Sequence, residues 1–321
     1  MVVELITRPR RIQRPLTVAL VNNMPDGAFT DTEDQFHRLV FGAGPDVNLE
    51  LYTFTGTPRC ENVAAIIDAR YRGLGELWHR PPDALIVTGT EPKQADMRHE
   101  PYWPHLARLL EWAAEFVPTV LLSCLSSHAS VLLFDGIERR RRQIKCSGVF
   151  PGRILDPDDP LAIGLPEHLM VPHSRLNEVP QSALVEAGYR VVVGDAGAGV
   201  DWSVAARERG RSLFVLCQGH PEYDTLSLLR EYRRDVRRYL LSKGGYGYPH
   251  LPDGYLSAAA TSQLEDFAVL ATAGRHDPKH LWSVFPYRQV ADTVQNTWRP
   301  GSMTLYANWL SLARAASAAV A

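Results

Sequence analysis

Two short motifs in this chain contain residue types that can form a catalytic pair. Cys124 lies within the Ser-Cys-Leu-Ser-Ser segment 123–127, and the tripeptide His-Pro-Glu occupies positions 220–222. A cysteine becomes a nucleophile when an imidazole takes its proton, and a carboxylate can orient that imidazole and stabilise its charged form. We therefore interpret Cys124 as a nucleophile, His220 as its base and Glu222 as the group that orients the base.

The sequence on either side of Cys124 predicts a strand-to-helix turn. The apolar run 119–123 suits a buried strand, and the apolar run 129–134 suits a helix. Such a turn lifts a nucleophile out of a sheet, and the positive end of the helix stabilises a thiolate. A buried core cysteine is the alternative for this turn alone, because free cysteines are commonly buried. The pairing with the second motif favours catalysis.

Strand and helix patterns alternate along the first half of the chain. Strands are expected at 16–21, 49–54, 84–87 and 119–123, and helices at 62–74 and 103–116. This alternation predicts an α/β fold with a flavodoxin-like, doubly wound, mainly parallel sheet and helices on both faces. Ligands bind beyond the carboxyl ends of such strands, so the loops after residues 21, 87 and 123 are expected to converge.

The second half of the chain is richer in candidate strands. They lie at 191–193, 203–205 and 212–216, and the last leads directly to His220. Helices are expected over 225–241, ended by Gly244, Gly245 and Gly247, and within 258–273. We divide the chain into an N-terminal extension at 1–15, a main domain at 16–250 and a C-terminal appendage at 251–321 that packs on it.

Composition excludes several classes of function. The 321 residues carry a net charge of −2, which leaves no overall electrostatic attraction for nucleic acid. The four cysteines lack the spacing of metal ligands, so no metal site is expected and a reducing cytoplasm fits them best. No stretch approaches the roughly 18 apolar residues of a membrane span. A cytoplasmic enzyme without a membrane partner is expected.

Further segments resemble a known enzyme family. A nucleophilic cysteine followed by His-Pro-Glu is similar to class I glutamine amidotransferase domains, and other segments resemble the homoserine O-succinyltransferase family, which shares that fold. They follow the family's order at 22–25, 32–36, 85–89, 102–104, 145–150, 172–175, 219–224, 231–235 and 308–310.

The resemblance implies an O-acyltransferase that moves a succinyl or acetyl group from acyl-CoA to the hydroxyl of L-homoserine, a step of methionine biosynthesis. Cys124 would attack the thioester, and His220 would deprotonate the acceptor hydroxyl. Backbone N–H groups after Cys124 and near Gly89 or Thr90 would form the oxyanion hole. The family also implies a homodimer, with acyl-CoA as a co-substrate and no permanently bound cofactor.

Four residues are candidates for substrate binding by the same resemblance. Arg234 matches an arginine that holds the acceptor carboxylate, and a guanidinium suits that bidentate role. Lys145 matches a lysine near the acyl site, and Ser174 and Arg175 would line the same pocket. Each has a structural alternative: a solvated helix face for Arg234, a surface position for Lys145, and a loop closure for the other two.

The chain departs from the family pattern in several places, which include a shorter N-terminal extension and an apparent insertion at 257–296. Leu125 and Ser126 replace the usual Trp-Ala after the nucleophile, and His128 replaces a common glutamine. The loop after Gly89 reads Thr-Glu-Pro-Lys, in which Lys93 is a candidate to favour an acidic acyl chain. The basic run 139–142 either attracts CoA phosphates or is a solvated patch.

Alternative functions remain open from the sequence. The acceptor of the acyl group could be another hydroxy amino acid, such as serine. A glutamine amidase that supplies ammonia to a partner is the second class, although such enzymes usually have glycine at the position of Ser126. A non-catalytic binding protein is the third class, and the intact Cys-His-Glu set disfavours it.

Overall fold

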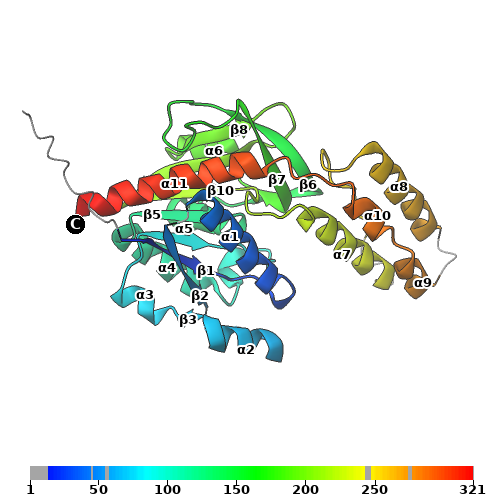
Figure 1. Ribbon diagram of the computed structural model, residues 1–321, viewed down its shortest axis with the longest axis horizontal. Helices are drawn as coiled ribbons and strands as arrows, with labels where there is room; N and C mark the ends of the chain where they lie inside the picture. The colour runs from blue at the N-terminus through cyan, green and yellow to red at the C-terminus, as the bar shows by residue number, and fades with distance from the viewer. Residues whose placement is uncertain (1–13, 45, 55–57, 243–246, 274–276, 321) are drawn as a thin grey trace, which may run out of the picture.

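The strand-length apolar runs of the sequence lie side by side in one sheet. The computed structural model describes residues 14–44, 46–54, 58–242, 247–273 and 277–320, so most of the predicted N-terminal extension lies outside the described residues, as do Gly244 and Gly245 (Figure 1). The ten strands are β1 (Leu16–Val21), β2 (Val47–Thr53), β3 (Arg72–Gly73), β4 (Ala84–Val87), β5 (Thr119–Ser123), β6 (Arg140–Ile154), β7 (His168–Glu178), β8 (Arg190–Asp195), β9 (Trp202–Arg209) and β10 (Ser212–Cys217).

The sheet has a parallel half and an antiparallel half. Its strand order is β3-β2-β1-β4-β5-β10-β9-β8-β6-β7. The first six strands of this order, β3-β2-β1-β4-β5-β10, are parallel to their neighbours. The four remaining pairs, β10-β9, β9-β8, β8-β6 and β6-β7, are antiparallel. Strands β5 and β10 are therefore parallel neighbours at the junction of the halves, and their carboxyl ends lie together.

Helices cover both faces of the sheet, as the alternating pattern predicts. The described α-helices are α1 (Phe29–Ala43), α2 (Glu61–Arg70), α3 (Gly75–His79), α4 (Trp103–Phe116), α5 (Leu125–Asp135), α6 (Gln181–Glu186), α7 (Ser227–Leu241), α8 (Ala258–Thr272), α9 (Pro278–Ser283), α10 (Tyr287–Ala291) and α11 (Arg299–Val320). Short 3-10 helices lie at Asp26–Ala28 and Met97–His99.

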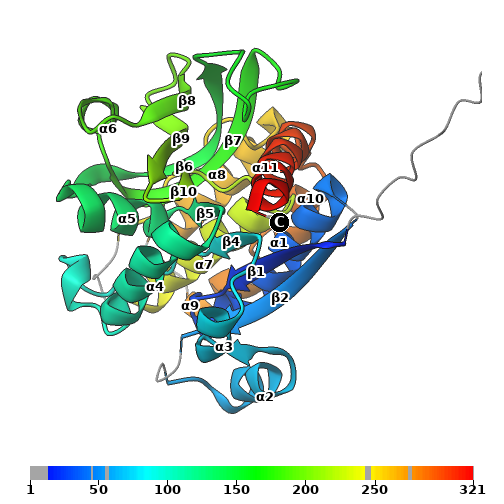
Figure 2. The same ribbon diagram turned by 90° about the vertical axis from the view of Figure 1, so that its left-hand side faces the viewer.

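Alternate side chains of the central strands divide the core into two layers. In β5, Val120 and Leu122 pack with α4 and α5 in one apolar cluster, whereas Leu121 packs with α1 and α11 in the other. Figure 2 shows these two pairs of helices on opposite sides of the strands. The period of two along each strand produces this separation.

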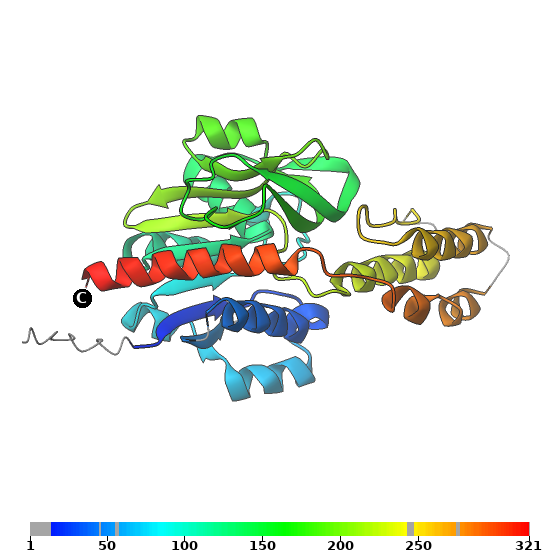
Figure 3. The same cartoon turned by 45° about the horizontal axis from the view of Figure 1, so that its top comes forward.

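The C-terminal segment has two different environments. Helix α11 lies across the sheet beside α1, where Tyr306 and Trp309 are fully buried. Helices α7 to α10 form a separate apolar cluster around Leu264, Phe267 and Trp298 at one end of the molecule (Figure 3). The segment predicted as an appendage thus contributes both a core helix and a helical lobe, defined here as residues 247–298 with α7.

One local prediction was wrong, and one hairpin was not predicted. The helix expected over 62–74 ends at Arg70, and a short edge strand follows it. The long β6-β7 hairpin was not predicted from the sequence. Pro151 and Pro172 lie within these strands, and the register shifts between Arg141 and Cys146, so the regular alternation that marks a strand is interrupted.

Candidate active site

Cys124 occupies a strained turn between β5 and α5. Its φ of 53° and ψ of −107° make it the one non-glycine residue with positive φ among the described residues. Its backbone N–H donates to the carbonyl of Cys217 at 2.7 Å, which anchors the turn to β10. Strain of this kind costs about 1–3 kcal/mol and is commonly stored at functional sites. The geometry is that of a nucleophile elbow.

The register of β5 and β10 brings the second motif to Cys124. Ser123 and Cys217 are paired as the last residues of the two strands, so the segment after β10 emerges beside the cysteine. His220 is hydrogen-bonded to the side chain of Cys124, and its backbone N–H donates to the Pro172 carbonyl at 2.7 Å. Parallel strand ends thus join two motifs that are distant in sequence.

The imidazole of His220 is oriented by a buried carboxylate. Nδ1 of His220 lies 2.9 Å from Oε1 of Glu222, and that oxygen also accepts the hydroxyl proton of Ser123 at 2.9 Å. Glu222 is 3% exposed. The Ser123 hydroxyl and the Glu222 carboxylate therefore fix the ring, and Nε2 is left to act on the thiol.

The electrostatics of the site favour a protonated His220. Burial opposes the charged imidazolium, but the charges of Cys124 and Glu222 and the hydrogen bonds to both outweigh it, so the pKa of His220 lies well above 6.5. An imidazolium beside the sulfur stabilises a thiolate. Tyr223 stacks on the ring with centroids 4.2 Å apart, which shields it from solvent.

A tight approach of β4 to the elbow positions backbone donors. A Cβ atom built on Gly89 would lie 3.1 Å from the Ser123 carbonyl and 3.2 Å from the Leu125 nitrogen. The loop after β4 therefore passes directly over the first turn of α5, where helical N–H groups point outward. Gly89 is buried, and Thr90 beside it is half-buried. Leu125 and this loop can supply donors to an oxyanion.

A partly buried ionic group lies beside Tyr223. Glu231 accepts hydrogen bonds from Tyr223 and Ser174 and pairs with Lys145 at 3.3 Å and with Arg234 at 3.5 Å. Burial disfavours its charge, but Lys145 and Arg234 outweigh this and lower the pKa of Glu231 to about 2. Three predicted substrate residues, Lys145, Ser174 and Arg234, thus meet at one carboxylate.

Comparisons with known proteins agree with this geometry. A family model described as homoserine O-succinyltransferase matches residues 3–318. The chain belongs to the homoserine O-succinyltransferase family. A relative of that name from Methylorubrum extorquens is 43% identical over 310 residues, covering 96% of this chain and 90% of the relative. One from Rhodopseudomonas palustris is 41% identical, covering 92% and 88%. This member of the family is therefore an acyltransferase.

Solved structures confirm the predicted fold of this acyltransferase. A glutamine amidotransferase from Methylobacillus flagellatus aligns with a TM-score of 0.52 and 14% identity over 93% of this chain and 95% of that one. One from Thermotoga maritima aligns with a TM-score of 0.50 and 13% identity over 94% and 99%. Both show the glutamine amidotransferase-like α/β architecture. Among the described residues, no helix is long and apolar enough to cross a membrane.

Other predicted residues lie apart from the Glu231 group. Arg175 is buried, and it donates to the Asn177 carbonyl at 3.1 Å and pairs with Glu178 at 3.3 Å. Lys93 is exposed on the loop after β4, and its backbone N–H donates to Glu100 at 2.5 Å. In the run 139–142, Arg139 and Arg142 are half-buried and the two arginines between them are exposed, so only part of the run is solvated.

The unusual neighbours of Cys124 brace the elbow. Ser126 donates to the Val87 carbonyl at 2.8 Å, and so ties α5 to β4. His128 is buried with Nε2 3.0 Å from Oε1 of Gln218, and burial lowers its pKa to about 3. A neutral His128 that bonds an amide is a packing residue of the acyltransferase rather than a second base.

The sequence did not single out Glu231 and Tyr223 as site residues, and both appear above only within segments that resemble the family. Helical spacing could have indicated Glu231, because Arg234 and Asp235 follow it by three and four residues and so share one face of α7. Glu33, within the segment 32–36 that resembles the family, is buried, pairs with Arg70 and accepts from Tyr71.

Proposed function

We propose that this acyltransferase moves an acyl group from acyl-CoA to the hydroxyl of L-homoserine through an acyl-enzyme on Cys124. The observation that carries the proposal is the contact of Cys124, at a strained elbow, with the oriented imidazole of His220 in a member of this family. Such a cysteine can store an acyl group, which splits one difficult transfer into two easier ones.

In the first step the Cys124 thiolate attacks the thioester carbonyl. The new bond joins Sγ to the carbonyl carbon, and the bond from that carbon to the CoA sulfur breaks. The departing CoA thiolate takes the proton held by His220. The N–H of Leu125 and donors of the loop at Gly89 and Thr90 would stabilise the oxyanion of the tetrahedral intermediate.

In the second step the homoserine hydroxyl attacks the acyl-enzyme. Neutral His220, oriented by Glu222, takes the hydroxyl proton while the new ester bond forms. The bond from the acyl carbon to Sγ then breaks and returns Cys124 to the thiolate. The protonated imidazole is restored at the same time, so the cycle closes without a cofactor.

The acceptor would bind on the side of α7. Arg234 has 43% of its side chain exposed while it pairs with Glu231 and Asp235, so its guanidinium can meet the amino acid carboxylate. Lys145 and Ser174 contact Glu231 on the same side of α7. A homodimer and a place in methionine biosynthesis stay predictions.

The proposal is tested by steady-state transfer assays with acetyl-CoA or succinyl-CoA and a panel of acceptors. We expect ester formation with L-homoserine, a much lower rate with L-serine, and complete loss in Cys124→Ala. The matched control is Cys60→Ala, which removes an exposed cysteine distant from the elbow in sequence.

Two outcomes would overturn the proposal. One is hydrolysis of glutamine without acyl transfer from either CoA ester, which would indicate an amidase. The other is full transfer activity in Cys124→Ala, which would remove the acyl-enzyme from the reaction. Preferred acylation of serine would keep the chemistry and replace the acceptor.

A further inference from the structure

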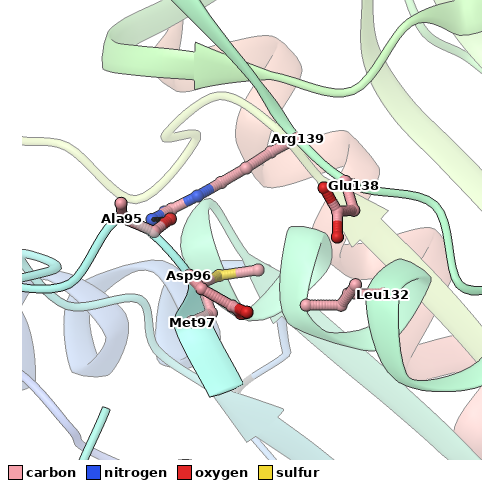
Figure 4. Close-up of a pocket in the computed structure, with 6 residues that line it drawn as sticks. All are labelled: Ala95, Asp96, Met97, Leu132, Glu138 and Arg139. Carbon is pink, nitrogen blue, oxygen red and sulfur yellow. Dashed lines mark hydrogen bonds between the residues drawn. The ribbon is translucent and has the colours of Figure 1, made fainter. Parts of the chain in front are cut away.

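A small cavity lies where the loop after β4 meets the end of α5. It has a volume of about 270 Å³ and is lined by Ala95, Asp96, Met97, Leu132, Glu138 and Arg139. Figure 4 shows the side chain of Arg139 extending across this space toward Ala95. Its walls combine apolar side chains, the carboxylates of Asp96 and Glu138, and the long cation of Arg139.

Arg139 has an unused donor inside the protein. Its Nη2 donates to the carbonyls of Gln94 at 3.2 Å and Ala95 at 3.3 Å, which fixes the guanidinium. Its Nη1 is buried, and no acceptor among the described residues lies within hydrogen-bonding distance. Because a buried donor without a partner costs about 1–3 kcal/mol, it usually has an explanation in function.

A second buried donor interacts electrostatically with Arg139. The hydroxyl of Tyr102 is also buried without a partner among the described residues. Burial lowers the pKa of Arg139, whereas Tyr102, Glu100 and Cys124 act on it in the opposite direction through their charges. The loop whose carbonyls Arg139 contacts also passes the elbow, where a Cβ built on Gly89 would lie 3.5 Å from Cβ of Cys124.

The acidic side chains at the cavity are held by another arginine. Arg98 pairs with Asp96 at 2.9 Å and with Glu138 at 2.8 Å. These contacts leave Nη1 of Arg139 available to a ligand. A guanidinium N–H and a phenol O–H together match the two oxygens of a carboxylate.

We propose that Arg139 and Tyr102 bind the free carboxylate of the acyl group that Cys124 carries, and so select a dicarboxylic acyl donor such as succinyl-CoA. This inference rests on the proposed function, because it needs an acyl group on Cys124. The acetyl group of acetyl-CoA has no free carboxylate, so neither residue would strengthen its binding. The two side chains are thus specificity-determining residues of the donor site.

The test compares two donors in three variants. Kinetics with saturating L-homoserine would give kcat/KM for succinyl-CoA and for acetyl-CoA in wild type, Arg139→Gln and Tyr102→Phe. We expect Arg139→Gln to lower the value for succinyl-CoA roughly 10- to 100-fold, the usual effect of a lost charged hydrogen bond, and to change that for acetyl-CoA less than about 3-fold. Tyr102→Phe should give a smaller loss in the same direction.

Two further variants separate recognition from packing. Arg140→Gln removes an exposed neighbouring charge and should leave the donor ratio unchanged. Arg139→Lys keeps the charge and should recover part of the preference for succinyl-CoA. Unchanged use of acetyl-CoA by Arg139→Gln would itself show that the variant folds.

The outcomes distinguish the inference from the proposed function. Equal losses with both donors would mean that Arg139 holds the CoA phosphates or the fold, and would overturn the inference. A wild-type preference for acetyl-CoA, or a donor ratio that Arg139→Gln leaves unchanged, would overturn it as well. If wild type uses neither donor, the proposed function fails first and the inference fails with it.

Discussion

At the scale of single residues, a chain of contacts runs from the Cys124 side chain to Glu231 on α7. Glu222 orients His220, Tyr223 stacks on the imidazole, and Glu231 accepts the hydroxyl of Tyr223. Two members of this chain of contacts have opposite shifts: the pKa of His220 is raised well above 6.5 and the pKa of Glu231 is lowered to about 2. The position of the catalytic base therefore depends on residues that never touch the nucleophile.

Glu222→Gln should lower the pKa of His220. The substitution removes a negative charge whose oxygen lies 2.9 Å from Nδ1, and that charge is one of the two that hold the pKa of His220 above 6.5. NMR titration of the ring carbons of His220 measures the effect, with Glu138→Gln as an exposed control. Identical titrations in wild type and Glu222→Gln would contradict this account.

The raised pKa of His220 also predicts how stability changes with pH. A histidine whose pKa is higher in the folded state stabilises the fold fully below its unfolded value of 6.5, and this contribution is lost as pH rises through the folded value. The free energy of unfolding of wild type should therefore fall relative to that of His220→Gln above pH 6.5. Urea titrations in a pH series measure this. If the difference in the free energy of unfolding between wild type and His220→Gln does not change with pH, the prediction is wrong.

Glu231→Gln should destabilise the protein at neutral pH and not in strong acid. The pKa of Glu231 falls from 4.5 to about 2 on folding, so its contribution, about 3 kcal/mol, is present above pH 4.5 and lost as pH falls through 2. Urea unfolding at pH 7 and near pH 3, where part of the contribution is already lost, measures this as a smaller difference from wild type at the lower pH. A difference from wild type that grows toward low pH would have the opposite sign to the one expected.

At the scale of elements, the ends of three parallel strands build the site. Strand β4 supplies the Gly89 loop, β5 supplies Cys124, and β10 leads to His220. These strands are short apolar runs with clear boundaries, so the sequence predicts each of them, and it predicts that the loops after β4 and β5 converge. The β6-β7 hairpin carries Lys145, Ser174 and Arg175.

The hairpin was not predictable because its pattern is mixed. Exposed arginines, two internal prolines and a register shift obscure its period, and only pairing with β8 makes it part of the sheet. For the same reason, family resemblance could name Lys145, Ser174 and Arg175, but only the structure shows that Arg175 lies apart from the other two. Glu231 contacts Lys145 and Ser174 because α7 packs against the β6-β7 hairpin, and no pattern in the sequence indicates that packing.

Gly89→Ala should impair catalysis more than stability. The new Cβ would lie 3.1 Å from the Ser123 carbonyl and 3.2 Å from the Leu125 nitrogen, so the loop must move away from the elbow and its donors with it. We expect kcat to fall about 10²-fold or more, as when an oxyanion donor is lost. Gly75→Ala is the matched control, because its Cβ would meet nothing within 4 Å. Equal activity of the two variants would disprove this role for Gly89.

At the scale of the whole molecule, the C-terminal third joins the core to the site. Trp309 on α11 is fully buried and donates to the hydroxyl of Thr119 at the start of β5 at 3.0 Å. Trp298 of the helical lobe donates to the Tyr223 carbonyl at 2.8 Å. These contacts could not be predicted from sequence patterns, because each joins segments far apart in the chain.

Trp309→Ala should therefore lower the free energy of unfolding strongly. Loss of a fully buried indole costs about 3–5 kcal/mol through lost burial and a cavity. Chemical denaturation measures it, with Val269→Ala, at a side chain that is 69% exposed, as the control expected to change little. A cost below about 1 kcal/mol would show that α11 is peripheral to the fold.

The central claim is that Cys124 carries the acyl group during transfer. Its most direct test is intact-mass analysis of the protein after incubation with succinyl-CoA in the absence of any acceptor. The account predicts a gain of one succinyl group, mapped to Cys124, absent from Cys124→Ala and discharged when L-homoserine is added. A protein that transfers the acyl group to L-homoserine while Cys124 never gains that mass, under rapid quenching, would contradict it.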